Sequence, residues 1–359
     1  MVGRERGRAL TSAAVLPQRR TRRIPTLVLA TVASLGVIIL TIAVALTLGP
    51  ANVSLVNVRD VITNHLGVTD IPVRVAADAI VWQERLPRAL VAAACGAGLG
   101  LCGVILQSLL RNPLADPFVL GVSSGASTGA VLFGVFGLGG GVLTLSGGAF
   151  AGALVAFALV LVIARFTGGG TASFVLAGIA ATQFFSALTS LAVFAFADSD
   201  ETRGVMFWLL GSLEGVRWDD VALCAAVVLL GAIVAFASVR PLDAFAFGDD
   251  VAASLGIHVA RTRMLLLVLT ALIAATLVSV AGAIGFVGLV LPHAARLLVG
   301  SRHARVIPVT IALGMVFMIT VDAVSRVAFA PVPLPVGVGT ALIGVPVFVA
   351  LLVRRRRRA

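Results

Sequence analysis

Long apolar runs recur along nearly the whole chain, with short polar segments between them. A helix needs about 20 apolar residues to cross the ~30 Å hydrocarbon core of a bilayer. Lipid admits only helices and closed barrels, and these runs are too long for barrel strands. The pattern therefore predicts an all-α, polytopic integral membrane protein with ten transmembrane helices. We place them at 26–48, 89–109, 118–137, 147–166, 172–196, 219–239, 262–283, 285–299, 306–325 and 337–353.

Two of these runs need comment. The eighth is short and is interrupted by Gly282, Gly285, Gly288 and Pro292, so its limits are poorly defined by the sequence. The first follows a basic stretch, as a signal peptide would. Its apolar region is too long for a signal peptide and no clear small-residue cleavage site follows, so we interpret it as a retained span.

The basic residues are distributed unevenly along the chain, and all 27 are arginines. If both termini are cytoplasmic and the spans alternate, 20 of the 27 arginines lie inside. That asymmetry satisfies the positive-inside rule, whereas nine or eleven spans would leave one terminal cluster outside. This ten-span topology predicts cytoplasmic termini. It leaves outside only Arg59, Arg74, Arg85, Arg88, Arg203, Arg217 and Arg326.

The same model sets the domain organisation. Residues 1–23 form an Arg-rich cytoplasmic tail, 24–353 a single transmembrane domain, and 354–359 a second Arg-rich tail. Two outside segments, 49–88 and 197–218, are long enough for short surface helices. The segment 240–261, which we call the coupling segment, is the one sizeable inside feature between the termini.

An amphipathic helix is expected within the coupling segment. Residues 249–257 can form it, with Val251 and Leu255 on one face and Ala252 beside them. A helix of this kind on the inside must meet either lipid headgroups or a partner protein.

Composition excludes several classes of function. The net charge of +11 would suit nucleic acid, but its clusters abut apolar runs at both termini, as orientation signals do. No lysine is present, so the chain has no P-loop, and energy from ATP must come through another subunit. The 3 cysteines lie in apolar runs without a disulfide or metal pattern, and we interpret them as packing residues.

The centres of the ten runs hold no charged residue. Ion-coupled secondary transporters usually carry ionisable groups there, so that class is disfavoured. A membrane-embedded enzyme would need paired acids, a His cluster, or a nucleophile with a base, and none converges in the sequence. The residues therefore favour neither an ion-coupled transporter nor a membrane-embedded enzyme.

Four motifs interrupt the apolar background. They are the RLPR stretch at 85–88; Gln107 followed by RNPLADP at 111–117 and LGVSSGA at 120–126; the stretch GDDVAASLG at 248–256; and GFVGLVLPH at 285–293 with Arg296. Asp322, Arg326 and the LPVG stretch at 334–337 follow the last of these.

Together these motifs resemble, in order and spacing, the permeases of ABC importers for ferric siderophores, haem and cobalamin (the FecCD-type permeases). The resemblance covers about residues 80–353. It departs from the family in the Arg-rich N-terminal extension and in Asp249-Asp250, where a Glu-Glu pair is more usual. It implies a permease dimer with a second permease subunit, two cytoplasmic ATPase subunits and an extracytoplasmic binding protein. It also implies a multi-pass protein of the bacterial inner membrane. ATP would be used by the partner, and this chain would bind no cofactor and no metal.

The resemblance also assigns roles to residues. Arg85, Arg88 and Arg326 match positions that receive acidic residues of the binding protein; the alternative is that they hold headgroups or pair with Glu84 and Asp322. The ATPase-contacting helix matches Gly248, Asp249, Asp250, Ala253, Leu255 and Gly256. The loop that closes the inner mouth of the pathway matches Gly169, Gly170 and Thr171. The remaining motif residues are Arg111, Asn112, Pro113, Asp116, Pro117, Pro292, His293 and Arg296.

Several of these residues also have a purely structural interpretation. RNPLADP predicts a rigid hairpin in which Pro117 begins a new helix, with Arg111 free to reach headgroups or helix-end carbonyls. The Gly-rich tracts 96–103, 121–129 and 282–288 favour close helix packing over flexible pore-lining segments. His293 is interpreted as a helix-end polar residue rather than a proton relay or metal ligand.

The cargo is inferred by analogy alone. A ferric siderophore is the first expectation, cobalamin and haem follow, and an importer of another substrate class remains the nearest rival.

Overall fold

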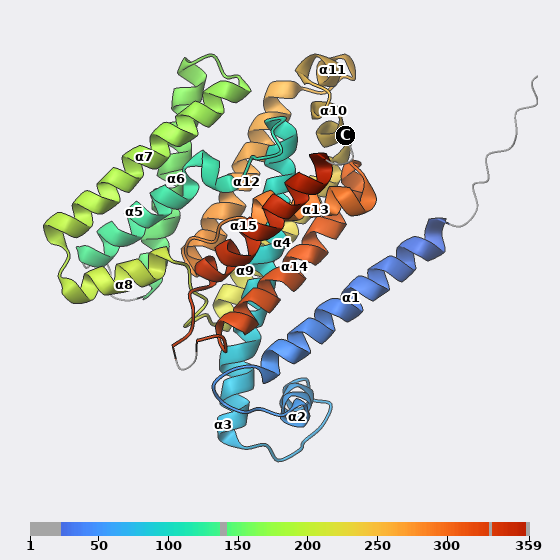
Figure 1. Ribbon diagram of the computed structural model, residues 1–359, viewed down its shortest axis with the longest axis vertical. Coiled ribbons are helices and arrows are strands. Elements are labelled where there is room, and N and C mark those ends of the chain that lie inside the picture. Colours follow the sequence, from blue (N-terminus) through green and yellow to red (C-terminus); the bar gives the residue numbers. More distant parts are fainter. Residues whose placement is uncertain (1–22, 137–141, 330–331, 357–359) are drawn as a thin grey trace, which may run out of the picture.

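The computed structural model describes residues 23–136, 142–329 and 332–356, and every regular element in these ranges is a helix. Figure 1 shows long helices running side by side, with shorter helices at the two ends of the bundle. The long helices are α1 (Arg23–Thr47), α4 (Leu86–Leu109), α5 (Val122–Val135), α6 (Val142–Phe166), α7 (Thr171–Phe196), α9 (Trp218–Ala237), α12 (Val259–Ala281), α13 (Val287–Val299), α14 (His303–Ser325) and α15 (Val336–Arg356).

Each of the ten apolar runs corresponds to one of these helices. In the described residues, 7 helices are long and apolar enough to cross a membrane, and α5, α13 and α15 have shorter apolar stretches. The prediction of an all-α, multi-pass membrane protein is confirmed. That all ten helices cross, and that both termini face the cytoplasm, stays a prediction.

Short helices occupy the segments where surface helices were expected. The segment 49–88 holds α2 (Leu55–His65), α3 (Val75–Asp78) and the π-helical stretch η1 (Ala79–Arg85), and 197–218 holds α8 (Ser199–Leu209). α3, η1 and α4 run on without a break as 35 residues, Val75–Leu109. The second span therefore belongs to a helix that begins well before residue 89. The other short helices are η2 (Pro117–Leu120), α10 (Val239–Phe245) and α11 (Asp249–Ser254).

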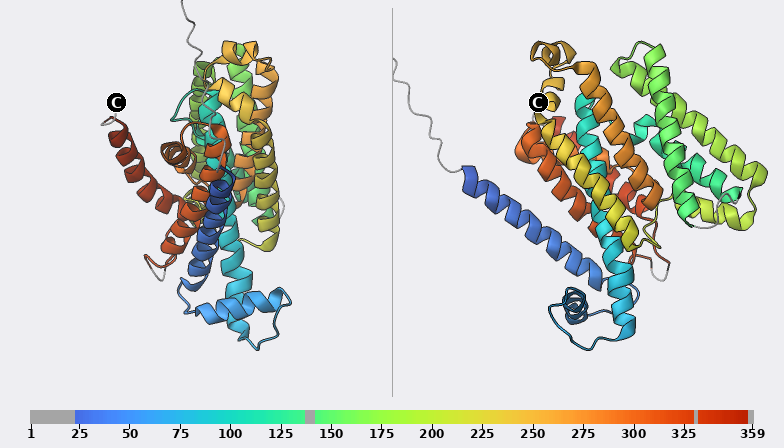
Figure 2. Two further views of the ribbon diagram at one scale, coloured as in Figure 1. Left: turned by 90° about the vertical axis from the view of Figure 1, so that its right-hand side faces the viewer. Right: turned by 180° about the vertical axis from the view of Figure 1, so that it is seen from behind.

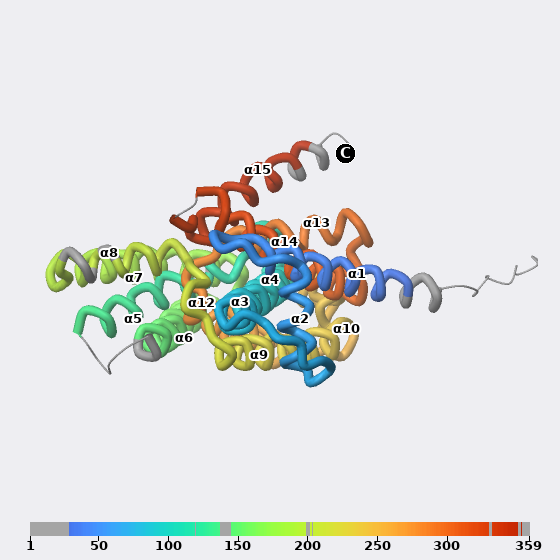
Figure 3. Tube along the Cα trace, turned by 90° about the horizontal axis from the view of Figure 1, so that it is seen from below, coloured from blue at the N-terminus to red at the C-terminus, as the bar shows by residue number. Residues whose placement is uncertain are grey.

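The helix α4 forms the centre of the bundle. Of its most apolar stretch, 94% is buried, compared with 11% for α1. Viewed along the bundle, α4 lies in the middle, while α1 and α15 lie at the periphery (Figure 3). α15 also leans away from the bundle when the molecule is turned (Figure 2). The two peripheral helices thus leave much apolar surface for lipid or another subunit.

Glycines bring helix backbones into direct contact, as the Gly-rich tracts predicted. A Cβ at Gly96 would lie 1.9 Å from the Gly314 oxygen, and one at Gly103 would lie 1.9 Å from the Gly288 oxygen. These contacts join α4 to α14 and to α13. Small residues favour such close approach between helices in membranes, where apolar burial against lipid adds little.

One sequence interpretation is wrong. His293 lies inside α13 and not at a helix end, and its side chain is buried. The sequence suggested an end because Pro292 precedes it. α13 continues through the proline to Val299, and the Gly288 carbonyl, which loses the backbone amide that proline lacks, accepts a hydrogen bond from Gln107 Nε2 instead.

Candidate functional site

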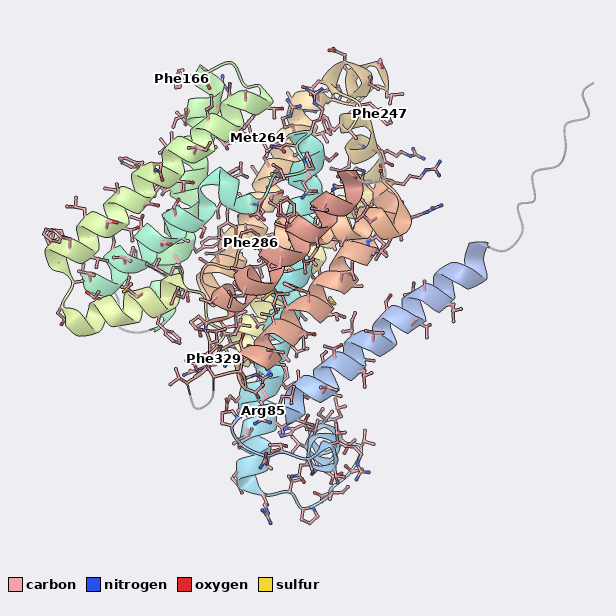
Figure 4. The ribbon with its side chains drawn as sticks, in the orientation of Figure 1. Arg85, Phe166, Phe247, Met264, Phe286 and Phe329 are labelled. Atoms are coloured by element: carbon pink, nitrogen blue, oxygen red, sulfur yellow. The ribbon has the colours of Figure 1, made fainter. Side chains whose placement is uncertain are left out.

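The predicted site residues separate into two groups at opposite ends of the bundle. Figure 4 places Arg85 at the end where α1 and α4 meet, and Phe247 at the other end, beside α11. We call these the Arg85 end and the α11 end. The predicted topology puts the Arg85 end outside and the α11 end inside.

At the Arg85 end, Asp322 is the centre of a buried ionic network. Its side chain is 1% exposed. One carboxylate oxygen accepts a hydrogen bond from Arg88 Nε at 2.7 Å, and the other lies 3.3 Å from Arg326 Nε. Asp322 and Arg326 are four residues apart on α14 and so share a helix face. Two guanidinium groups therefore share one carboxylate in a low-dielectric setting.

Arg85 and Arg326 also bind the end of α1. Arg85 donates to the carbonyls of Leu46 (2.8 Å) and Ala51 (2.7 Å). Arg326 donates to Ala45 (3.0 Å) and Leu48 (3.2 Å). The last carbonyls of a helix lack intrahelical partners and form the negative end of its dipole, so cations are favourable there. We call Arg85, Arg88, Asp322 and Arg326 the arginine cluster.

The three arginines predicted to dock a binding protein are therefore brought together, but they are buried. Their exposures are 2% for Arg85, 6% for Arg88 and 4% for Arg326. Arg88 and Arg326 pair with Asp322, which was the alternative considered for them. In this single chain the arginines join α1, α4 and α14. Their contact with a binding protein stays a prediction.

At the α11 end, the coupling segment folds into two short helices, α10 and α11. α11 follows Gly248 (φ +117°) and ends before Gly256 (φ +79°), where glycine avoids the strain of a left-handed backbone. It is shorter than expected, since residues 255–257 lie outside it. Leu255 is 67% and Val251 41% exposed, whereas Ala252 is fully buried and faces the core. The exposed apolar face thus holds Val251 and Leu255 without Ala252.

Side chains from three long helices hold this segment in place. Arg263 of α12 bonds Asp249 at 2.6 Å, and its guanidinium lies 5.7 Å from the Phe245 ring centre. Ser108 of α4 donates to the Leu242 carbonyl at 2.7 Å. A further contact, between α10 and α14, is described below. The remaining predicted coupling residues, Asp250 and Ala253, lie on α11 itself.

The RNPLADP stretch forms the rigid hairpin that its prolines predicted. Asn112 Oδ1 accepts from the Leu114 amide at 2.9 Å, next to Pro113. Asp116 Oδ1 accepts from the Phe118 amide at 3.0 Å, and Pro117 begins η2. Arg111 has φ +47°, and one guanidinium nitrogen lies beside Gly248. The hairpin therefore lies against the start of α11.

Residues of the second and fourth motifs meet behind this hairpin. Gln107 accepts from Arg296 at 2.5 Å and donates to the Gly288 carbonyl at 3.1 Å. The second carboxylate oxygen of Asp116 is buried without a hydrogen bond, and a Cβ at Gly288 would lie 2.9 Å from it. Burial raises the pKa of Asp116 from 3.8 to about 6. Nothing in the sequence revealed that these two motifs are neighbours.

The predicted gate loop lies between α6 and α7. Gly168 (φ +98°) and Gly169 (φ +71°) adopt conformations that favour glycine, and a Cβ at Gly168, Gly169 or Gly170 would meet nothing within 4 Å. Thr171 begins α7. Phe166, next to the loop, lies at the same end as Phe247 in Figure 4. The location fits an inner mouth, and the gating role stays a prediction.

Within the described residues, no group of three or more His, Cys, Asp or Glu side chains is placed to hold a metal ion. Cys95, Cys102 and Cys224 are buried and free. Taken together, the helices that can cross a membrane define a multi-pass membrane protein.

Comparison with known proteins identifies the family. A family model described as the FecCD transport family matches residues 37–354, and the chain belongs to that family. A cobalamin import system permease protein of Halobacterium salinarum is 43% identical over 288 residues, 79% of this chain and 76% of that protein. An iron(3+)-hydroxamate import system permease protein of Bacillus subtilis is 33% identical over 332 residues, 92% of this chain and 84% of that protein.

A solved structure shares the fold. It is described as a metal-chelate type ABC transporter in an inward-facing conformation. It superposes with a TM-score of 0.80 at 29% identity, and the alignment covers 92% of this chain and 99% of that chain. The likeness extends over nearly the full length of both chains, so the arrangement of helices described here is that of an ABC importer permease.

Proposed function

We propose that the chain is the permease subunit of a binding-protein-dependent ABC importer that carries a metal chelate into a bacterial cell through its inner membrane. Family membership supports the class. The observation that carries the mechanism is the exposed apolar pair Val251 and Leu255, held at one end of the bundle by polar contacts to α4, α12 and α14. An apolar face on a firmly anchored helix suits contact with a separate ATPase subunit.

The remaining partners follow from the same family. The assembly would hold a second permease subunit, two cytoplasmic ATPase subunits and one extracytoplasmic binding protein. Movement of the ATPase subunits would act on α11, and the helices would respond as packed units rather than by bending continuously. No step of this mechanism requires a cofactor on the permease itself.

The coupling role is tested at Leu255. Leu255→Asp places a charge on the exposed apolar face of α11 without touching the buried core, because Leu255 is 67% exposed. We expect the variant to insert and fold normally but to lose transport, while ATP hydrolysis no longer responds to cargo. Leu255→Met, which keeps an apolar side chain of similar volume, is the matched control and should transport normally.

Reconstituted vesicles that hold the permease, its ATPase and its binding protein provide the assay. Cargo uptake and ATP hydrolysis are measured on the same preparation. Normal uptake by Leu255→Asp would remove the assignment of α11 as the contact with the ATPase.

The proposed cargo is a ferric siderophore, as the sequence analysis ranked first, and the Bacillus relative named for iron(3+)-hydroxamate supports it. Cobalamin is the second candidate, favoured by the 43% identity to the Halobacterium permease. Haem remains the third candidate of the family. Deletion of the gene should slow growth under iron limitation, with rescue by excess simple iron salt. A deletion strain indifferent to iron but dependent on added cobalamin would reverse the ranking.

A further inference from the structure

Asp243 and His303 join the coupling segment to α14. His303 Nδ1 lies 2.6 Å from Asp243 Oδ1, and the His303 backbone amide donates to the same oxygen at 3.0 Å. The His303 side chain is 4% exposed, whereas that of Asp243 is 41% exposed. The two residues are 60 positions apart in the chain, so the contact is tertiary.

The Asp243 carboxylate acts as a cap for α14 supplied by another helix. His303 is the first residue of α14, and its amide is one of the groups that no residue of α14 can satisfy. The residue before it, Arg302, makes no capping bond with its side chain. A carboxylate at this position also lies at the positive end of the helix dipole. The start of α14 is thus fixed by α10.

α14 in turn extends from the coupling segment to the other end of the molecule. In its middle it meets α4 through the backbone contact of Gly314 with Gly96. Near the end of α14, Asp322 binds Arg88 of α4. Arg326, the first residue after α14, binds the carbonyls that end α1. A displacement of α10 therefore reaches the arginine cluster through one helix that is held at its start, middle and end.

We propose that Asp243 and His303 are positioning residues that transmit movement of the ATPase-contacting helix to α14, and through it to the Arg85 end. The inference rests on the proposed function, since it presumes that α11 receives an ATPase. The contact suits this role because it is charge-assisted, short and largely shielded from water on the His303 side. The other bonds of the coupling segment lead to α12 and α4 but not to α14.

The test is the amount of cargo carried for each ATP hydrolysed. In Asp243→Ala, which removes both bonds, we expect this ratio to fall by roughly tenfold or more, since each hydrogen bond to a charged group is worth about tenfold. Asp243→Asn keeps an oxygen for the His303 amide and should show a smaller fall. Because the two side chains act through one contact, adding His303→Ala to Asp243→Ala should cause little further loss.

The probes are a radiolabelled ferric hydroxamate siderophore and radiolabelled cobalamin, offered to the reconstituted complex of permease, ATPase and binding protein. Asp219→Ala, which removes an exposed acid from the first turn of α9, is the matched control. Thermal melting in detergent is measured for every variant, because a purely structural role would lower the melting temperature and reduce uptake and hydrolysis together.

A cross-link separates transmission from stability. With Asp243→Cys and His303→Cys, a short, cleavable thiol reagent should restore the ratio, and its cleavage should abolish it again. The native cysteines are buried and should not compete. An unchanged ratio in Asp243→Ala, or a cross-link that restores melting without restoring the ratio, would overturn the proposal. If the parent complex transports neither probe and no haem, or if Leu255→Asp transports normally, the proposed function fails instead.

Discussion

The arginine cluster gives the sharpest prediction for stability. Asp322→Asn replaces the carboxylate with an amide of the same shape and leaves two guanidinium groups buried without an anion. Removal of one partner from a buried ion pair typically costs about 3–5 kcal/mol. The amide oxygen can still accept the bond from Arg88, so we expect the lower end, about 3 kcal/mol.

The assay is unfolding in mixed micelles of increasing denaturing-detergent content, followed by tryptophan fluorescence. Trp82 and Trp218 pack together with ring centres 4.9 Å apart and should report on this end of the bundle. Glu214→Gln, at an exposed position, is the control and should lie within about 0.5 kcal/mol of the parent.

A second variant separates charge from packing. Arg88→Met combined with Asp322→Leu removes one guanidinium together with the carboxylate, so that only Arg326 is left buried without its anion. We therefore expect the double variant to be more stable than Asp322→Asn alone. An Asp322→Asn variant as stable as the parent would refute the argument that this buried carboxylate holds the cluster together.

Three further predictions follow from other sites. Gly103→Ala puts a Cβ 1.9 Å from a backbone oxygen of α13 and should destabilise by about 1–3 kcal/mol or more, whereas Gly147→Ala in α6 meets nothing within 4 Å and should be neutral or stabilising in the same unfolding assay. The raised pKa of Asp116, about 6, means that the folded chain binds more protons than the unfolded chain between roughly pH 4 and 6, so stability rises as pH falls through that window. Asp116→Asn should abolish this dependence and be more stable at neutral pH by up to about 3 kcal/mol, measured as melting against pH. Single cysteines at Ser199 and Ala246 should label from opposite sides of an intact membrane, and labelling from one side would refute the ten-span topology.

Helix positions could be predicted from the sequence because the length of a run of apolar residues can be read locally, without knowing its neighbours in the fold. Each expected run corresponds to a helix. The limits differ most at the second run, 89–109, whose continuous helix already begins at Val75. The run 285–299, which glycine and proline interrupt, differs by only two residues, because α13 begins at Val287 after Phe286 adopts φ +68°. A left-handed phenylalanine has no sequence signature, since glycine is the residue that usually signals that conformation.

The contacts between motifs could not be predicted, because they depend on which helices become neighbours. The pairing of Arg88 with Asp322 was offered only as the alternative to docking, because the sequence does not show that residues 234 positions apart become neighbours. Asp243 carried no signal at all. It is one acid in a coupling segment that was examined for its apolar face, and its role appears only when the start of α14 lies beside it. The docking role of the arginines was implied by the family resemblance, and the topology placed them outside. Their burial follows from the end of α1 packing over them.

The attachment of α1 has a consequence for how the chain is made. α1 leaves the ribosome before α4 and α14, yet Arg326, which binds its last carbonyls, is synthesised 281 residues after Ala45. Arg85 arrives much sooner, 39 residues after Leu46. During translation α1 can therefore be held by Arg85 alone while most of the bundle is still absent. Its final docking waits for α14, which makes the earliest of the described helices one of the last to be fixed in place.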